Sequence, residues 1–356
     1  MHGLSWRRMA NANVTAVTGA SNVAPAALAA SNPRTVRILS IDGGGIRGII
    51  PALVLARIEK LTGQPTAQLF DVVAGTSTGG ILALGLTVPK APGHPLYQAE
   101  EFAEMYEREG RRIFSRSVFR TLFTTDSLFW KKYSSDGIEQ VLAEYFGDSR
   151  LRDAATDVLI TSYELERRFP FFFKSTNARC RSDYDFPARD VARATSAAPS
   201  YFAPMKIPTG TNSDHYTLID GGVFANNPAA CALVEARTTH PNAERYLVVS
   251  LGTGSLMQTL PLNLAQYWGA VRWVKPLLDA VFDGVSSTVD FQLRQLLPDD
   301  YYRFQTTLSG HNHGLDDASP ENITALKGLA SALIEEKSAD LEQVSEELVT
   351  SPSRKE

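Results

Sequence analysis

A serine between two closely spaced glycines is the first group in this sequence that could carry out chemistry. The segment Gly75-Thr76-Ser77-Thr78-Gly79 follows an apolar run and precedes an apolar helical pattern. In a tight strand-to-helix turn the flanking positions must be small, and the serine hydroxyl is lifted clear of the backbone. The helix that follows points its free N–H groups at developing negative charge. This setting is typical of a nucleophilic serine; a glycine-rich turn with a passive serine is the alternative.

A run of three glycines provides a second candidate site. It lies within Asp42-Gly43-Gly44-Gly45-Ile46-Arg47-Gly48, directly after a short apolar run. Its N–H groups could form an oxyanion hole facing Ser77, or they could hold the pyrophosphate of a dinucleotide. A dinucleotide site needs an acidic residue about 20 positions further on, at the end of the next strand. The next strand runs into Ser77 instead, and Glu59 falls inside a helical pattern. The oxyanion hole is therefore the better interpretation.

Arg47 at the end of this loop has two interpretations. Its guanidinium could bind a phosphate or carboxylate group of a substrate, or it could form a structural salt bridge.

Asp220-Gly221-Gly222 is the third candidate. Residues 216–219 are predicted to form a strand, so Asp220 should stand at its carboxyl end, where sheet enzymes place catalytic groups. An aspartate with its ordinary pKa of about 3.9 is a poor base for a serine hydroxyl. Burial would raise this pKa, and direct contact with Ser77 would offset the weak basicity by positioning. An ordinary Asp-Gly turn is the alternative.

A histidine base is less well supported than Asp220. His215 is five residues from Asp220, and in a strand this odd separation puts the two side chains on opposite faces. None of the histidines has a strand-end position like those of Ser77 and Asp220. The spacing therefore favours a Ser–Asp dyad, with a distant histidine as the alternative. The six histidines are His2, His94, His215, His240, His311 and His313.

The elements that must position these groups form an α/β pattern. A strand, a glycine turn and a helix occur twice, over residues 36–61 and 69–86. Further strands are predicted at 158–163, 169–173 and 246–251, and no internal repeat is visible. We predict a flexible leader at 1–35, one catalytic domain at 36–330 and a charged C-terminal helix at 331–356.

Composition narrows the class of protein. The chain has 356 residues, 35 basic against 39 acidic residues and 44% hydrophobic residues, which argues against a nucleic-acid binder and against disorder. Two cysteines, Cys180 and Cys231, suit a reducing compartment, so we expect a cytoplasmic protein. No apolar run reaches the ~18 residues of a transmembrane helix.

An aromatic and basic stretch at residues 102–133 could meet anionic lipid headgroups. The alternative is that its aromatic side chains belong to the core and its arginines are solvated. The aromatic residues are Phe102, Tyr106, Phe114, Phe119, Phe123, Phe129 and Trp130, and the arginines are Arg108, Arg111, Arg112, Arg116 and Arg120.

The three motifs together resemble those of the patatin-like phospholipases. The likeness extends to residues 39–51, 70–80, 194–202, 218–228 and 251–254, and covers roughly residues 36–330. It implies a three-layer α/β/α domain with a mostly parallel central sheet and helical additions. It also implies hydrolysis of fatty acyl esters of phospholipids and galactolipids without a metal ion or other cofactor.

The same resemblance assigns roles residue by residue. It implies that Ser77 is the nucleophile, Asp220 the general base and the N–H groups of Gly43–Gly45 the oxyanion hole. Many plant members have alanine where this chain has Gly222, a change between small residues that the fold should tolerate. It implies membrane lipid as the partner, with peripheral membrane contact.

Alternatives remain for the biological role. Some bacterial patatin-like proteins are antiphage phospholipases switched on by a cyclic nucleotide, so a small-molecule activator is conceivable. A dinucleotide-binding oxidoreductase using the glycine loop is a less favoured alternative, and a non-catalytic lipid-binding or storage protein is disfavoured by the intact motifs.

Overall fold

A computed structural model describes residues 34–91, 94–95, 97–114, 134–209, 214–256, 266–267, 269–308 and 314–350. The predicted leader, apart from Arg34 and Thr35, lies outside these residues. The division of the chain into leader, catalytic domain and C-terminal helix stays a prediction.

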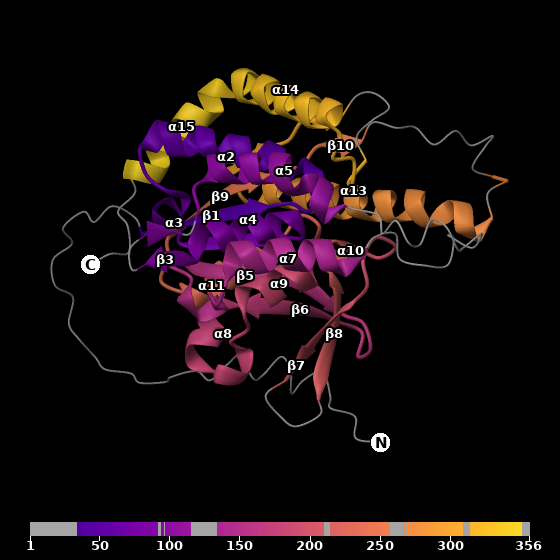
Figure 1. The fold of residues 1–356 in the computed structure, drawn as a ribbon. Coiled ribbons are helices and arrows are strands. Elements are labelled where there is room, and N and C mark those ends of the chain that lie inside the picture. The colour runs from indigo at the N-terminus through magenta and orange to yellow at the C-terminus, as the bar shows by residue number, and fades with distance from the viewer. Residues whose placement is uncertain are drawn as a thin grey trace. The chain divides into compact units, whose positions relative to one another are not determined.

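A mixed sheet of eight strands organises the described residues, in the order β11-β9-β1-β2-β5-β8-β7 with β6 paired to β5 (Figure 1). Its strands are β1 (Thr35–Ile41), β2 (Val72–Thr76), β5 (Asp157–Glu164), β6 (Phe169–Lys174), β7 (Met205–Pro208), β8 (His215–Asp220), β9 (Arg245–Leu251) and β11 (Tyr301–Phe304). Two small sheets pair β3 (Pro89–Ala91) with β4 (His94–Pro95) and β10 (Ser255–Leu256) with β12 (Thr307–Leu308).

The helices pack on both faces of the sheet. The main ones are α2 (Ile49–Thr62), α4 (Thr78–Thr87), α5 (Ala99–Ile113), α7 (Ser135–Phe146), α9 (Ala188–Thr195), α11 (Ala229–Thr239), α13 (Ala270–Leu296), α14 (Pro320–Glu336) and α15 (Ser338–Thr350). Short helical turns are η1 (Gly45–Gly48), α3 (Thr66–Leu69), η2 (Leu151–Asp153), α8 (Ser175–Cys180), η3 (Ser182–Tyr184) and α10 (Gly222–Ala225).

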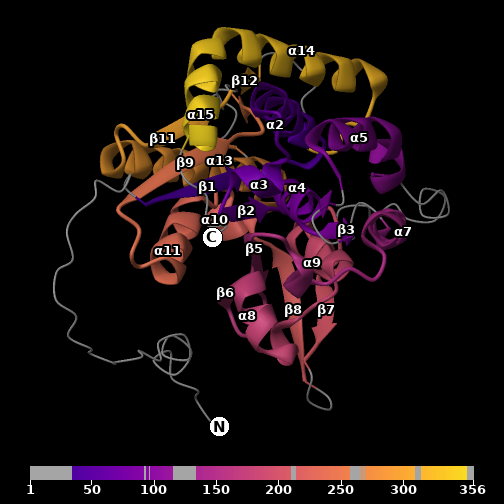
Figure 2. The same ribbon diagram turned by 90° about the vertical axis from the view of Figure 1, so that its left-hand side faces the viewer.

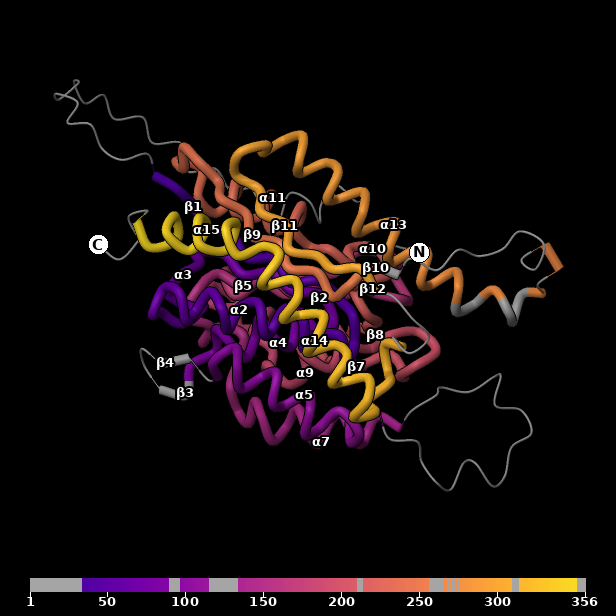
Figure 3. The backbone as a smooth tube through the Cα atoms, turned by 90° about the horizontal axis from the view of Figure 1, so that it is seen from above, coloured from indigo at the N-terminus to yellow at the C-terminus, as the bar shows by residue number. Residues whose placement is uncertain are grey.

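Alternating side chains of the inner strands build two separate cores. In β1, Ile38 packs into the core shared with α11 and the end of α13, whereas Leu39 and Ile41 pack into the core shared with α2, α4 and α5. Successive strand residues point to opposite faces, so a strand buried on both sides reads as a continuous apolar run. Figure 2 shows α2 and α11 on opposite sides of β1 and β2, and Figure 3 shows α11 and α13 on one side of the sheet with α5 and α7 on the other. The predicted three-layer α/β/α class is confirmed.

The direction of β8 positions the site. From β11 through β9, β1 and β2 to β5 every pairing is parallel, whereas β6, β8 and β7 run antiparallel to their neighbours. β2 pairs with residues 157–161 of β5. β8 pairs with the next residues of β5, 162–164, along the same edge of that strand. β2 and β8 therefore approach each other end to end along β5, and the residues that follow Thr76 meet Asp220.

The C-terminal region, where one charged helix is predicted, forms two helices, α14 and α15. Ser319 caps α14 by accepting a hydrogen bond from the Asn322 N–H at 3.3 Å, and Pro320 occupies its first turn. An apolar stripe of Leu341, Val344 and Leu348 is buried in α15. α14 and α15 both pack on α2, so the end of the described chain belongs to the α/β core.

Candidate active site

Ser77 occupies the sharp turn between β2 and α4, as predicted. Its backbone has φ 55° and ψ −122°, a conformation that costs a non-glycine residue about 1–3 kcal/mol and is concentrated at functional sites. A Cβ on Gly75 would lie 2.2 Å from the Gly79 carbonyl oxygen, and one on Gly79 would lie 2.2 Å from the Ile41 carbonyl oxygen. Both positions therefore require glycine, which is the steric demand of a nucleophile elbow.

Asp220 ends β8 and is only 2% exposed. Its Oδ1 accepts a hydrogen bond from the Gly222 N–H at 2.7 Å, and its carboxyl group lies beside the Ser77 side chain in the same cavity. Burial raises the pKa of Asp220 to about 6, although the nearby Ser77 side chain and the Gly222 N–H act in the opposite direction. A carboxylate with this pKa is a stronger base than an exposed aspartate and is still ionised at neutral pH.

The glycine loop, Gly43–Gly45, lies next to Ser77 and Asp220. Its N–H groups differ from one another in their hydrogen-bond partners. The Gly43 N–H donates to the Asn226 carbonyl at 3.0 Å, and Thr253 Oγ1 donates to the Gly43 carbonyl at 2.6 Å. Gly44 and Gly45 line the cavity beside Ser77, and their N–H groups have no backbone partner within the described part of the chain. These two N–H groups are therefore the better candidates for binding an oxyanion.

A buried ion pair anchors the start of this loop. Arg303 of β11 donates to both carboxylate oxygens of Asp42, at 2.6 and 3.0 Å, and to the Ser250 hydroxyl at 2.9 Å. The Arg303 and Asp42 side chains are 4% and 2% exposed. The sequence motif identified Asp42 but not its partner, because Arg303 lies 261 residues further along the chain.

Arg47 is buried on the far side of the loop, in a second, smaller pocket. Burial lowers the pKa of its guanidinium, and the carboxylates of Asp279 and Asp283 in α13 act in the opposite direction. These acidic neighbours favour the structural interpretation of Arg47 over substrate binding. Gly48, the residue after Arg47, leaves room for the Thr78 side chain, because a Cβ at Gly48 would lie 2.4 Å from Thr78 Oγ1.

The two glycines after Asp220 make room for close neighbours. A Cβ on Gly221 would lie 2.1 Å from Thr161 Oγ1, so this position requires glycine. A Cβ on Gly222 would lie 3.1 Å from Asp220 Oδ1 and 3.1 Å from the Phe282 ring. These contacts are tight, and small shifts of the neighbours would admit an alanine at Gly222.

A largely apolar cavity opens above Ser77 and Asp220. Its empty space is about 620 Å³, a volume that includes open solvent at its mouth. Its walls come from α4, α5, α7, α13 and the loops on either side of the sheet. The apolar lining residues are Ile81, Ile113, Phe114, Ile138, Ala198, Phe202, Phe282 and Leu315.

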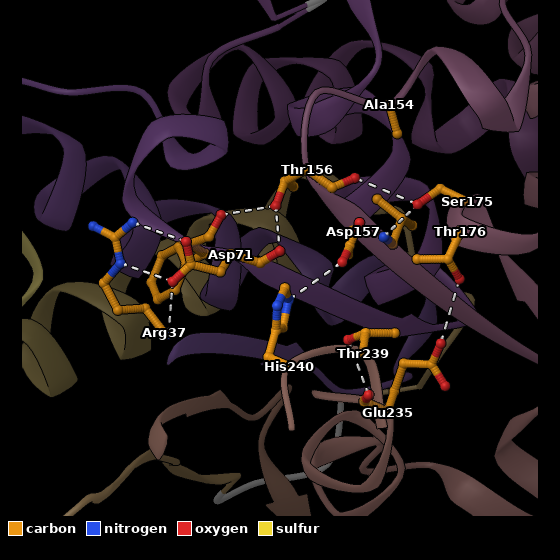
Figure 4. Close-up of polar contacts among 12 residues, drawn as sticks. Arg37, Asp71, Ala154, Thr156, Asp157, Ser175, Thr176, Glu235, Thr239 and His240 are labelled. Atoms are coloured by element: carbon orange, nitrogen blue, oxygen red, sulfur yellow. Dashed lines mark hydrogen bonds and ion pairs between the residues drawn. The ribbon is translucent and has the colours of Figure 1, made fainter. Parts of the chain in front are cut away.

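The histidines whose side chains are described lie away from this cavity. His240 is buried with its Nε2 atom 3.3 Å from Asp157, in a polar cluster at the amino ends of β2 and β5 that also contains Arg37 and Asp71 (Figure 4). His215 begins β8, at the opposite end from Asp220, and lies 3.5 Å from Glu166.

Glu59 has a structural role at the end of α2. Its carboxylate accepts hydrogen bonds from the Thr66 N–H at 2.8 Å, the Thr66 hydroxyl at 2.7 Å and the Ala99 N–H at 3.0 Å. With these oxygens engaged by neighbouring backbone, Glu59 is not placed to bind a ribose, which counts against the dinucleotide alternative.

The aromatic and basic stretch is only partly described. Phe102 and Tyr106 are 1% and 2% exposed in the core, and Arg112 is ion-paired with Glu144 and Glu109. Up to Phe114 the core interpretation is therefore the better one. Residues 115–133, with the remaining aromatic residues and arginines of that stretch, lie outside the described residues.

Four residues that support the site were missed as functional residues. Thr195 Oγ1 accepts a hydrogen bond from the Ser77 N–H at 2.8 Å, Asn226 and Thr253 hold Gly43, and Arg303 holds Asp42. Three of these residues lie in or next to segments that resemble the family, at 194–202, 218–228 and 251–254, and this likeness is the signal that could have found them.

Comparison with known proteins identifies the family. Residues 39–233 match the family model for patatin-like phospholipase. The chain is 34% identical to patatin-like protein 2 of Arabidopsis thaliana, over 84% of this chain and 83% of that protein. It is 32% identical to Patatin-1-Kuras 2 of Solanum tuberosum, over 86% of this chain and 88% of that one. A looser match to the solved structure of VipD from Legionella pneumophila has 13% identity and a TM-score of 0.37, over 86% of this chain and 68% of that chain.

The chain belongs to the patatin-like phospholipase family. This membership supports lipid acyl hydrolase activity in general. Within the described residues, no helix is long and apolar enough to cross a membrane. The same residues contain no group of three or more His, Cys, Asp or Glu side chains arranged to hold a metal ion.

Proposed function

We propose that this protein is a lipid acyl hydrolase of the phospholipase A or galactolipase type that uses Ser77 as nucleophile and Asp220 as general base. The observation that carries this proposal is that Ser77 lies beside a buried carboxyl group in the same cavity, and that burial raises the pKa of this carboxyl group to about 6. A base next to a serine on a strained turn is the arrangement expected of an activated serine nucleophile.

The reaction proceeds in two steps. Asp220 accepts the Ser77 proton as Ser77 Oγ attacks the ester carbonyl carbon, and the carbonyl oxygen becomes an oxyanion. The oxyanion then re-forms the carbonyl, the bond to the leaving oxygen breaks, and Asp220 returns the proton to that oxygen. Water repeats the sequence on the acyl-enzyme: Asp220 takes its proton, the fatty acid leaves and Ser77 regains its hydrogen.

The oxyanion would be held by the N–H groups of Gly44 and Gly45. The loop is fixed before substrate arrives, since Asn226 and Thr253 bind Gly43 and Arg303 binds Asp42. Donors fixed in advance need no reorganisation as charge develops, and one such donor is worth about 10²–10³-fold in kcat.

The acyl chain would occupy the apolar cavity. Burial of its methylene groups against side chains such as Phe202 and Phe282 stabilises the bound lipid by about 0.8 kcal/mol per CH₂ group. Since such lipids reside in bilayers, we propose peripheral membrane contact by an otherwise cytoplasmic protein.

The experiment that tests this function measures fatty acid release from mixed phospholipid and galactolipid vesicles, with excess chelator present. Wild-type protein is compared with the Ser77→Ala and Asp220→Ala variants. Activity that both substitutions abolish supports the dyad, whereas activity that survives Asp220→Ala points to a histidine base. An inactive wild type would be assayed again with cyclic nucleotides, which separates a missing activator from a binding role.

The pH dependence follows from the raised pKa of Asp220. Because only its carboxylate form accepts the serine proton, kcat/KM should fall about tenfold per pH unit below a midpoint near 6. Above that midpoint the rate should be flat until some other group titrates. A pH–rate profile on a soluble 4-nitrophenyl ester measures this, and a midpoint near the ordinary aspartate value would contradict it.

A further inference from the structure

Ser196 is a buried side chain in the cavity whose hydrogen-bonding capacity is unused. It follows α9, is 7% exposed and lines the same cavity as Ser77 and Asp220. Its hydroxyl oxygen has no hydrogen-bond partner among the described residues. A buried hydroxyl left without a partner costs about 1–3 kcal/mol, a cost that a hydrogen bond to a polar atom of the substrate would remove.

The residues on either side of Ser196 accept hydrogen bonds from the backbone N–H groups of Ser77 and Asp220. Thr195 Oγ1 accepts from the Ser77 N–H at 2.8 Å and donates to the Thr161 carbonyl at 2.6 Å. The Ala197 carbonyl accepts from the Asp220 N–H at 3.1 Å. The backbone on both sides of Ser196 is thus tied to the residues that carry the proposed nucleophile and base.

Other polar side chains of the cavity already have partners. Thr78 and Tyr106 share a hydrogen bond through their hydroxyl groups. The Asn226 side-chain amide donates to the Ser286 hydroxyl at 3.0 Å. The Ser196 hydroxyl differs from these side chains in having no described hydrogen-bond partner.

We propose that the Ser196 hydroxyl donates a hydrogen bond to the leaving oxygen of the ester and, in the second step, to the attacking water. This role rests on the proposed hydrolase function. Asp220 must protonate the leaving oxygen, so that oxygen has to come within hydrogen-bond distance of Asp220, in the cavity that Ser196 also lines. Water then attacks from the position that the leaving group vacated, with Asp220 as base again.

The hydrogen bond matters in proportion to the charge on the leaving oxygen. As the carbon–oxygen bond breaks, electrons pass to that oxygen, Ser196 stabilises the charge and Asp220 supplies the proton. An alkoxide needs this help because it is strongly basic, whereas 4-nitrophenolate leaves readily without it. Ser196 forms no covalent bond and keeps its own proton.

The test compares two butyrate esters that have the same acyl group, 4-nitrophenyl butyrate and a glycerol monobutyrate. The variant Ser196→Ala should lower kcat/KM for the glycerol ester by about 10–100-fold, the value of a hydrogen bond to a charged group. For both esters kcat/KM reports acylation. Because 4-nitrophenolate leaves readily without a hydrogen bond, kcat/KM for the nitrophenyl ester should change by less than about threefold. The matched control is Ser345→Ala, which removes another buried hydroxyl without a described partner, in α15.

The outcomes separate this role from the function it rests on. Selective loss on the glycerol ester in Ser196→Ala, with Ser345→Ala unchanged, supports the proposal. Equal loss on both esters would make Ser196 a structural residue, and no loss on either would show that it touches no reacting atom; both results overturn the proposal. Wild-type protein that cleaves neither ester, with or without cyclic nucleotides, refutes the hydrolase function itself, and the role of Ser196 falls with it.

Discussion

Replacing Ser77 with alanine, or Asp220 with asparagine, lowers kcat for ester hydrolysis by at least about 10⁴-fold. Ser77→Ala removes the atom that attacks the carbonyl carbon, and Asp220→Asn removes the base while keeping nearly the same shape. Because the two groups act as a unit, the double variant should be no slower than the worse single variant. Hydrolysis of 4-nitrophenyl butyrate measures all three, and a fluorophosphonate probe should label wild-type Ser77 only.

The same substitution at Asp220 should stabilise the fold. Holding an ionised carboxylate in this buried site is unfavourable, and a pKa raised from 3.8 to about 6 corresponds to about 3 kcal/mol. Between these two values the native state binds more protons than the unfolded chain, so wild-type stability falls as the pH rises. The amide side chain of the Asp220→Asn variant does not ionise, so this pH dependence should disappear. The free energy of unfolding of the variant should match that of wild type below the pKa of the unfolded state, and the difference should reach its full size above about pH 6.

Urea unfolding of wild type and Asp220→Asn across this pH range measures the effect. Asp148→Asn is the matched control, since its side chain is fully exposed. If the difference between Asp220→Asn and wild type did not grow with pH, the idea that burial of this carboxylate is unfavourable would be wrong.

Arg303→Met should be the most destabilising single change near the site. It leaves the Asp42 carboxylate buried without its cation, which costs about 3–5 kcal/mol when one partner of a buried pair is removed. The glycine loop begins at Asp42, so the surviving folded protein should also show slower fluorophosphonate labelling of Ser77.

Two comparisons test the reason for this loss. The double variant Asp42→Asn with Arg303→Met removes both charges and should recover part of the stability. Lys327→Met breaks an exposed pair with Glu107 and should cost less than about 1 kcal/mol in urea unfolding. An Arg303→Met protein as stable as Lys327→Met would show that the buried pair does not hold the loop.

Local sequence predicted the individual elements well. The strand ending at Ile41, the Ser77 turn and the strand ending at Asp220 were all found, because apolar runs and glycines report short-range steric demands. The α/β class followed from the repeated strand–turn–helix order. The predicted hydroxyl and carboxyl groups do lie together, although their roles remain proposals.

Other features depend on which distant segments come together. No local pattern shows that β8 runs antiparallel and meets β2 end to end on β5, yet this arrangement brings Asp220 to Ser77. Arg303 and Asp42 are 261 residues apart, and whether they meet depends on β11 pairing with β9. Residue types and their spacing determine the conformation of short segments, since those interactions are local. The partners of a buried charge, the unused hydroxyl of Ser196 and the pKa of Asp220 depend on burial, and only tertiary packing decides burial.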